Sequence, residues 1–155
     1  MFVSDEVYEH MPMDGKTHLR LAKYPGFWDR TISVYSLGKT FSCTGWRIGF
    51  AIGPDYLIKP LLSSQNWLEF SVNRPAQWAF SKALPLTLEP YEGSNSYYDW
   101  LEKTFTEKKK RLSNILHRSP FNWAILEPEG GYFTCVDVTG AIPQIPKKYF
   151  YEHGQ

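Results

Sequence analysis

The chain has 155 residues, of which 43% are hydrophobic and 21% are charged, and its formal net charge at pH 7 is +1. This composition is typical of a folded domain rather than a disordered chain, and the near-neutral charge favours neither nucleic acid nor an anionic membrane surface as a partner. No apolar run approaches the length of a membrane span. The two cysteines, Cys43 and Cys135, form no CxxC pattern, so we expect reduced thiols in an intracellular protein.

The first residues predict a strand that ends in an acidic loop. Phe2 and Val3 close the strand, and Asp5 follows at its carboxyl end, the edge of an open α/β sheet at which ligands bind. An isolated Asp more often only caps a turn. Beyond it the chain is polar, with a short helical turn expected near residues 19–23. His10 and His18 lack a carboxylate at metal-ligand spacing, so we expect surface histidines and no metal site.

A lysine lies in a glycine-bracketed turn between two apolar runs. Residues 31–35 alternate and are β-branched, which predicts a strand, and residues 48–52 predict another. Lys39 lies between them, and the first strand brings it to the same edge as Asp5. A P-loop is excluded because position 33 is Ser33, where that motif needs a glycine. A lone loop lysine is usually solvated, whereas one held in a shaped pocket can form an imine with an aldehyde.

Helices dominate the rest of the chain. We expect one helix from Asp55, as its cap, to about residue 70, and another that starts at Pro75 and is bent or ended by Pro85. The composition breaks at residues 93–95, and a long amphipathic helix is predicted for residues 97–117.

The basic run of this long helix and the two segments after it complete the chain. Residues 108–111 are all basic, but they lie in the C-terminal half of the helix, where cations are favoured, so we expect a solvated face rather than a nucleic-acid site. Strands are predicted for residues 123–126 and 132–138, joined by a turn.

Four segments resemble those of the fold-type I pyridoxal-phosphate (PLP) aminotransferases. Residues 36–49 read Ser-x-Gly-Lys-Thr-x-x-x-Thr-Gly-Trp-Arg-x-Gly, a long ungapped pattern that is most similar to the branch of kynurenine aminotransferases, cysteine-conjugate β-lyases and methionine aminotransferases. The other segments are residues 4–10, residues 75–77 and, as Glu-Gly-Gly-Tyr-Phe, residues 129–133. They occur in the family's order and together span the chain.

The resemblance implies a role for five residues and PLP as the cofactor. Lys39 forms the Schiff base with the cofactor and moves the Cα proton of the substrate. Asp5 pairs with the pyridine nitrogen, and Tyr8 bonds the phenolic oxygen of the ring. Ser36 and Arg47 anchor the phosphate. Arg47 together with a dry pocket would lower the pKa of Lys39 toward neutrality.

The same resemblance sets the expected fold, function and partners. It implies an α/β fold that combines the C-terminal half of the PLP-binding large domain, a mixed sheet with helices over residues 1–92, with the start of the small α+β domain over residues 93–155. The expected reaction is transamination between an aromatic or sulfur-containing L-amino acid, such as kynurenine, and a 2-oxo acid. Family members are homodimers. Cytoplasmic localisation is expected, or mitochondrial if a preceding segment directs it there.

The beginning of the chain inside a predicted strand leads us to expect a fragment of a longer enzyme. Such a fragment would bind PLP weakly or not at all on its own. Two alternatives stay open. The chain could be a non-catalytic piece that pairs with full-length subunits, or the enzyme could be a β-lyase acting on cysteine conjugates, because both reactions pass through the same carbanion.

Overall fold

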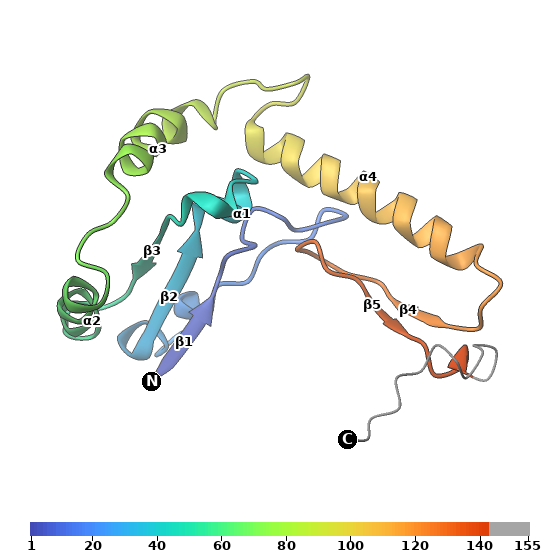
Figure 1. Ribbon diagram of the computed structural model, residues 1–155, viewed down its shortest axis with the longest axis horizontal. Helices are drawn as coiled ribbons and strands as arrows, with labels where there is room; N and C mark the ends of the chain where they lie inside the picture. Colours follow the sequence, from blue (N-terminus) through green and yellow to red (C-terminus); the bar gives the residue numbers. More distant parts are fainter. Residues whose placement is uncertain (143–155) are drawn as a thin grey trace, which may run out of the picture.

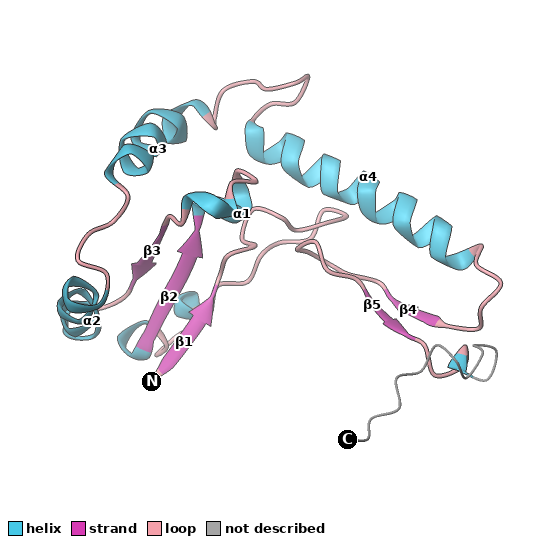
Figure 2. Cartoon of the chain, in the orientation of Figure 1, coloured by secondary structure: helices cyan, strands magenta, loops and turns pink. Residues whose placement is uncertain are grey.

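The computed structural model describes residues 1–142, and its centre is a three-stranded sheet with the order β1-β2-β3 (Figure 1). Strand β1 (Phe2–Asp5) pairs in parallel with β2 (Thr31–Ser36), and β2 pairs antiparallel with β3 (Gly49–Ile52). The sheet is therefore mixed and lies among helices, which confirms the predicted α/β fold class (Figure 2).

Strand β2 is the buried strand of this sheet. Thr31, Ser33 and Tyr35 alternate along one face, and all three are at least nine-tenths buried. The flanking strands are more exposed, because each lies at an edge of the sheet. Ile48 is buried but precedes β3 rather than belonging to it, so this strand is one residue shorter than predicted.

Two helices follow β3 close to the predicted bounds. Helix α2 (Asp55–Leu68) begins after Pro54, which holds the cap position, so the prediction of Asp55 as the cap was wrong. Asp55 is the first helical residue instead, where its carboxylate pairs with the Lys59 ammonium at 2.8 Å. Helix α3 (Arg74–Leu86) is capped by the Asn73 side chain, which accepts from a backbone amide of the first turn at 3.1 Å.

Helix α4 (Tyr97–His117) has the predicted bounds and starts at a Ser96 cap. Its basic run is not simply a solvated face. The Lys109 side chain is only 13% exposed, and its ammonium lies 2.7 Å from the Asp14 carboxylate and 3.7 Å from that of Glu127. The solvated-face prediction was wrong for Lys109 because its partners lie far away in sequence.

A two-stranded hairpin follows α4 and lies beside it in Figure 1. Strand β4 (Ala124–Leu126) pairs antiparallel with β5 (Cys135–Asp137). The predicted second strand was too long at its N-terminal end. Tyr132 and Phe133 lie in the connection before β5, because Gly131 has a φ of +74° and turns the chain there.

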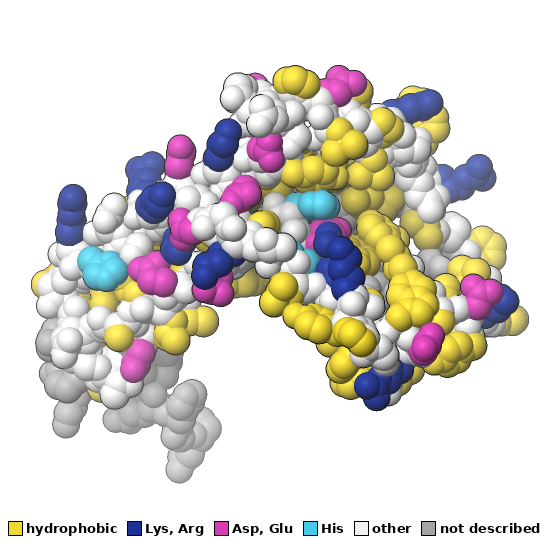
Figure 3. Space-filling view, turned by 180° about the vertical axis from the view of Figure 1, so that it is seen from behind, with side chains coloured by type: hydrophobic (Ala, Val, Ile, Leu, Met, Phe, Trp, Pro, Cys, Tyr) yellow, Lys and Arg dark blue, Asp and Glu magenta, His cyan; other side chains and the backbone are white. Residues whose placement is uncertain are grey.

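A small apolar core joins α3 to the segment that carries the lysine. Ile48, Ala76 and Phe80 are buried, and the partly buried side chains packed against them are Leu37, Phe41 and Cys43. Many other apolar side chains are exposed, and Figure 3 shows them gathered beside a hollow on one face. Within residues 1–142, none of the helices combines the length and apolar character that a membrane crossing requires.

Candidate active site

The parallel pairing of β1 with β2 brings two predicted site segments to one edge of the sheet. Asp5 lies opposite Val34 in the register, so β1 and β2 end side by side. Ser36 is the last residue of β2, and the one-turn helix α1 (Leu37–Thr40) that carries Lys39 follows at once. The edge arrangement expected from the sequence is thus confirmed.

The Lys39 amine points to an aromatic side chain from the far end of the chain. Its Nζ donates to the Tyr132 hydroxyl at 3.0 Å and lies 5.7 Å from the centroid of the same ring. Tyr132 in turn packs edge-on against Tyr8, with ring centroids 5.0 Å apart. Lys39 and Tyr8, both predicted from the sequence, therefore converge on a third residue, Tyr132, for which the sequence predicted no role.

The charge of Asp5 acts on Tyr8, which packs against Tyr132. Partial burial, hydrogen bonding with Tyr132 and the nearby carboxylate of Asp5 raise the pKa of Tyr8 to about 12. The Asp5 side chain is exposed, and its Oδ1 accepts from the Val7 amide at 3.3 Å. Asp5 therefore caps the turn that follows, the commoner role for an isolated Asp, and it also lies near the phenol of Tyr8.

Close backbone packing shapes the loop that presents Lys39. A Cβ atom at Gly38 would come within 3.0 Å of the Thr44 Cα, so the two halves of the loop can approach only with glycine there. The Cys43 amide donates to the Gly38 carbonyl at 2.9 Å, and the Tyr97 hydroxyl of α4 donates to the Thr40 carbonyl at 2.8 Å. The loop is thus held both from within and from α4.

The two predicted phosphate ligands lie on either side of this loop. Ser36 lies at the cap position of α1 without a capping side-chain bond, and it lines a cavity of about 200 Å³. Arg47 is exposed, has a left-handed backbone with a φ of 52°, and donates to the Thr44 carbonyl of its own turn at 3.3 Å. The phosphate-binding roles of Ser36 and Arg47 stay predictions.

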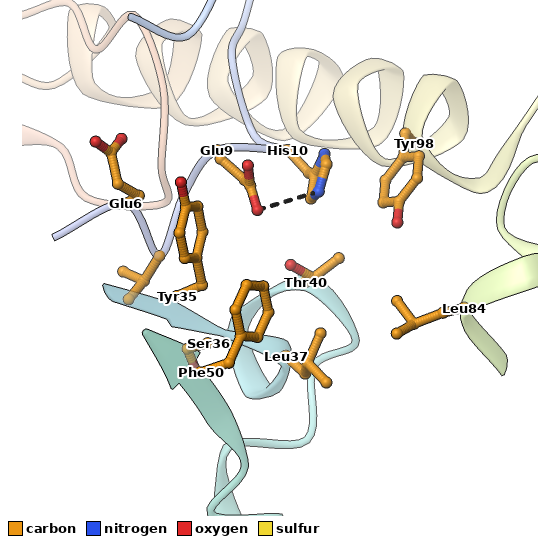
Figure 4. A pocket seen from close by; sticks show the side chains of 11 residues that line it. Glu6, Glu9, His10, Tyr35, Ser36, Leu37, Thr40, Phe50, Leu84 and Tyr98 are labelled. Carbon is orange, nitrogen blue, oxygen red and sulfur yellow. Dashed lines mark ion pairs between the residues drawn. The ribbon is translucent and has the colours of Figure 1, made fainter. Parts of the chain in front are cut away.

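The cavity beside Ser36 is walled by aromatic rings and carboxylates (Figure 4). The Tyr35 and Phe50 rings are stacked 4.8 Å apart. Glu9 accepts from the Arg20 guanidinium at 2.6 Å and lies 3.4 Å from the His10 ring nitrogen. The acidic side of this cavity is therefore charge-compensated.

The two histidines expected at the surface are partly buried, with 29% of the His10 side chain and 23% of the His18 side chain exposed. The His10 ring stacks on Tyr98 at 4.0 Å, and its burial lowers its pKa below the ordinary value. His18 pairs with the carboxylate of Glu6, whose side chain is 2% exposed and also accepts from the Ser4 hydroxyl at 2.8 Å. The surface prediction was therefore wrong in part, because Tyr98 covers one face of His10 and His18 packs against the buried Glu6.

The arrangement has the donor set of a site for an aldehyde cofactor with a pyridine ring. Lys39 offers an amine to the aldehyde, Tyr8 a hydroxyl to a ring oxygen and Asp5 a carboxylate to a protonated ring nitrogen. Comparison with known proteins points the same way. Residues 1–152 match the family model described as aminotransferase class I and II, and the chain belongs to this family. Its members depend on PLP, so the residues present fit the cofactor.

Several relatives of this chain are kynurenine–oxoglutarate transaminases. Kynurenine–oxoglutarate transaminase 3 of Homo sapiens is 36% identical over 143 residues, which are 92% of this chain and 31% of that protein. The kynurenine–oxoglutarate transaminase of Dictyostelium discoideum is 39% identical, over 88% of this chain and 30% of that protein. The chain thus spans about a third of the length of these relatives.

Solved structures show the same similarity in three dimensions. The YbdL protein of Escherichia coli, identified with a methionine aminotransferase function, superposes with a TM-score of 0.76 at 33% identity, over 87% of this chain and 33% of that one. An aromatic aminotransferase from Pyrococcus horikoshii OT3 gives a TM-score of 0.71 at 30% identity, over 85% of this chain and 34% of that one. Each superposition therefore covers at least 85% of this chain.

Proposed function

We propose that this chain is the cofactor-anchoring part of a PLP-dependent aminotransferase. Its reaction would transfer the amino group of an aromatic or sulfur-containing L-amino acid, such as kynurenine, to a 2-oxo acid. The observation that carries the proposal is the convergence of the Lys39 amine and the Tyr8 phenol on one point, with Asp5 beside them. The names of the relatives support the kynurenine-type substrate.

When bound, PLP supplies a carbonyl that exchanges amines and a ring that withdraws electrons from the substrate Cα. The chain supplies the groups that hold the cofactor and move the proton. Lys39 would hold the cofactor through its side-chain amine, and the free amine would take and return the Cα proton of the substrate. Asp5 keeps the ring nitrogen protonated through Coulomb attraction, and Tyr8 donates a hydrogen bond to the ring oxygen.

Ser36 and Arg47 complete the proposed cofactor site by binding the phosphate. Arg47 offers the planar pair of N–H donors that suits a phosphate. Its left-handed backbone is uncommon for a residue with a side chain, and strained residues of this kind often lie at functional sites. A fixed phosphate would prevent the ring from swinging away from Lys39, and the alignment of reacting groups depends on that constraint.

Selective labelling of Lys39 tests this proposal. The chain is incubated with excess PLP, reduced with borohydride, digested and mapped by mass spectrometry, with Lys39→Arg and Tyr8→Phe as variants. Excess cofactor is used because weak binding is expected, and the readout is selectivity among lysines rather than affinity. We expect Lys39 to be labelled in preference to the exposed Lys16 and Lys59. Equal labelling of all exposed lysines, with Lys39 unmodified, would overturn the proposal.

The products then distinguish transamination from β-lyase activity. Loaded protein is given methionine or kynurenine, and separately a cysteine conjugate with a good leaving group. A 2-oxo acid that retains the substrate side chain indicates transamination. Pyruvate and ammonia from the conjugate indicate β-elimination, the alternative that uses the same carbanion.

We also propose that the chain works in association with further aminotransferase polypeptide, as a homodimer or paired with full-length subunits. Apolar side chains on and after α2, and on α3, support this, because Trp67, Phe70 and Trp78 are 89%, 91% and 68% exposed. Sedimentation of the chain alone and mixed with a full-length transaminase measures the association directly. A monomer in both samples would contradict it.

A further inference from the structure

The Lys39 amine is held by a residue outside the set that the sequence predicted. Tyr132 accepts a hydrogen bond from Lys39 Nζ at 3.0 Å, although 93 residues separate the two in sequence. Free lysine side chains have long flexible stems, so an amine fixed at one point is constrained by its partner. The position of the Lys39 amine therefore depends on the position of Tyr132.

Backbone contacts, rather than side-chain flexibility, set where Tyr132 lies. The Gly131 amide donates to the Met11 carbonyl at 2.9 Å, and the Met13 amide donates to the Glu129 carbonyl at 2.9 Å. These bonds form an isolated bridge that ties the connection before β5 to the segment after Tyr8. Met11 and Met13 are 1% and 3% exposed, so the side of this attachment that residues 11–13 form is largely buried.

Two glycines permit this attachment. A Cβ at Gly130 would lie 3.0 Å from the Met11 carbonyl oxygen, and Gly131 has a left-handed φ of +74°. A Cβ at Gly131 would also touch the Tyr8 ring at 3.4 Å. The Gly-Gly-Tyr sequence therefore turns the chain against Met11 and places the following phenol beside Tyr8.

The Tyr132 phenol lies between the Tyr8 ring and the Lys39 amine, with its ring centroid 5.0 Å from that of Tyr8 and its hydroxyl 3.0 Å from Lys39 Nζ. Interaction with Tyr8 and Lys39 lowers the pKa of Tyr132 below its ordinary value, whereas the pKa of Tyr8 is raised. On the side of α4, Lys108 and Lys109 line a hollow together with Tyr132 and several apolar side chains, and Lys109 is paired there with the carboxylates of Asp14 and Glu127.

We infer that Tyr132 is a positioning residue for the Lys39 amine. Its hydroxyl holds the amine beside Tyr8 whenever the amine is not bonded to the cofactor, so the amine stays where the aldehyde must arrive. This inference rests on the proposed function and adds to it a residue supplied by the hairpin side of the molecule. Loss of the hydroxyl would leave Lys39 free to rotate, and fewer encounters with the aldehyde would be productive.

The cofactor-free chain gives the first test. Tyr132→Phe keeps the ring and removes the hydroxyl, and Tyr24→Phe makes the same change at a distant exposed ring. Lysine amines are labelled as ¹³C-dimethylamines, and the Lys39 resonance is assigned with Lys39→Arg. We expect Tyr132→Phe to shift the Lys39 resonance and to move the titration of Tyr8 to lower pH. A Lys39 resonance and Tyr8 titration that match those of Tyr24→Phe would overturn the inference.

Lys39→Met tests the same contact from the other side. Loss of the ammonium should raise the titration midpoint of Tyr132 toward that of an ordinary tyrosine, as measured by the difference between the ultraviolet absorbance titrations of Lys39→Met and wild type. This variant leaves the hairpin untouched, so it decides the question even if Tyr132→Phe fails to fold. An unchanged midpoint would show that the amine and the phenol do not interact.

Cofactor capture separates this inference from the proposed function. We expect the initial rate of borohydride-trapped labelling at Lys39 to fall roughly fivefold in Tyr132→Phe, the range for a lost hydrogen bond, and to be unchanged in Tyr24→Phe. Equal rates in both variants would refute the positioning role alone. An unlabelled wild-type Lys39 would refute the proposed function, and the two titrations above would still decide the contact.

Discussion

The Lys109 ammonium of α4 lies 2.7 Å from the Asp14 carboxylate, 95 residues earlier in the chain. The hydrogen bond from Lys109 lowers the pKa of Asp14, and the same bond raises the pKa of Lys109. Two nearby bonds reinforce this attachment, because the Gly15 amide donates to Glu102 at 3.1 Å and the Asp14 amide to Thr106 at 3.3 Å. Helix α4 is thus fastened to the loop that leads away from Tyr8.

The pKa shifts determine how this ion pair contributes to stability at different pH values. A lowered carboxyl pKa stabilises the fold above the ordinary value of 3.8, and that contribution is lost as the pH falls through the folded-state pKa. A raised ammonium pKa stabilises below the ordinary value of 10.5, and that contribution is lost at higher pH. The ion pair therefore contributes fully to the stability of the fold between the ordinary pKa values of the two groups, 3.8 and 10.5.

Lys109→Met should remove this contribution. We expect the variant to be less stable than wild type at neutral pH and to lose less stability than wild type on acidification through the Asp14 pKa. Urea unfolding at several pH values measures both effects. Lys110→Met is the control, because it removes the same charge from an exposed neighbour on the same helix. Identical acid sensitivity of wild type and Lys109→Met would contradict the prediction.

Two glycines beside Arg47 allow a matched test of the lysine loop. A Cβ at Gly49 would lie 2.4 Å from the Tyr35 carbonyl oxygen, whereas a Cβ at Gly45 would have nothing within 4 Å. We expect Gly49→Ala to cost about 2 kcal/mol or more, because the backbones of β2 and β3 must separate. Gly45→Ala should change the unfolding free energy by no more than about 0.5 kcal/mol.

Gly49→Ala should also weaken cofactor capture. Gly49 pairs with Ser36 in the sheet register, so separation of the strands displaces the residue that precedes the Lys39 turn. Borohydride-trapped labelling at Lys39 and urea unfolding report the two effects independently. Equal stability of the two alanine variants would show that β3 can move away without cost.

Which parts of this site could be predicted from the sequence depends on how many residues separate the partners of each contact. Parallel strands carry their ends to a common edge, so Asp5, Ser36 and Lys39 could be placed together from local patterns alone. The role of Tyr8 followed from the resemblance to the aminotransferases. The other three depend on strand ends and short turns, which local sequence patterns predict.

Contacts between distant segments could not be predicted in this way. Tyr132 belongs to a segment recognised by its resemblance, but it was assigned to a strand, because a Gly-Gly turn does not reveal which carbonyl it docks on. The basic run that contains Lys109 looks solvated, because helical periodicity gives the face of a residue and not its partner. The partial burial of His18 was missed for the same reason, since the sequence does not show that it pairs with the buried Glu6.

Tyr97 links α4 to the loop of the cofactor lysine and provides the last test. Its hydroxyl donates to the Thr40 carbonyl at 2.8 Å, and its ring stacks on Phe41 at 5.2 Å. Burial raises the pKa of Tyr97, which fits a phenol that stays protonated as a donor. Tyr97→Phe keeps the stacking and leaves a carbonyl of the residue next to Lys39 without this donor.

We expect Tyr97→Phe to lower the unfolding free energy by roughly 1 kcal/mol, the usual net value of one such hydrogen bond, and to slow labelling of Lys39 by PLP. Tyr98→Phe is the control, because it makes the same change at the next residue of α4, where the ring stacks on His10. Urea unfolding and the initial labelling rate are measured for both variants. If the two variants label Lys39 at the same rate, α4 does not position the lysine loop, and the loop is organised by its own glycine packing alone.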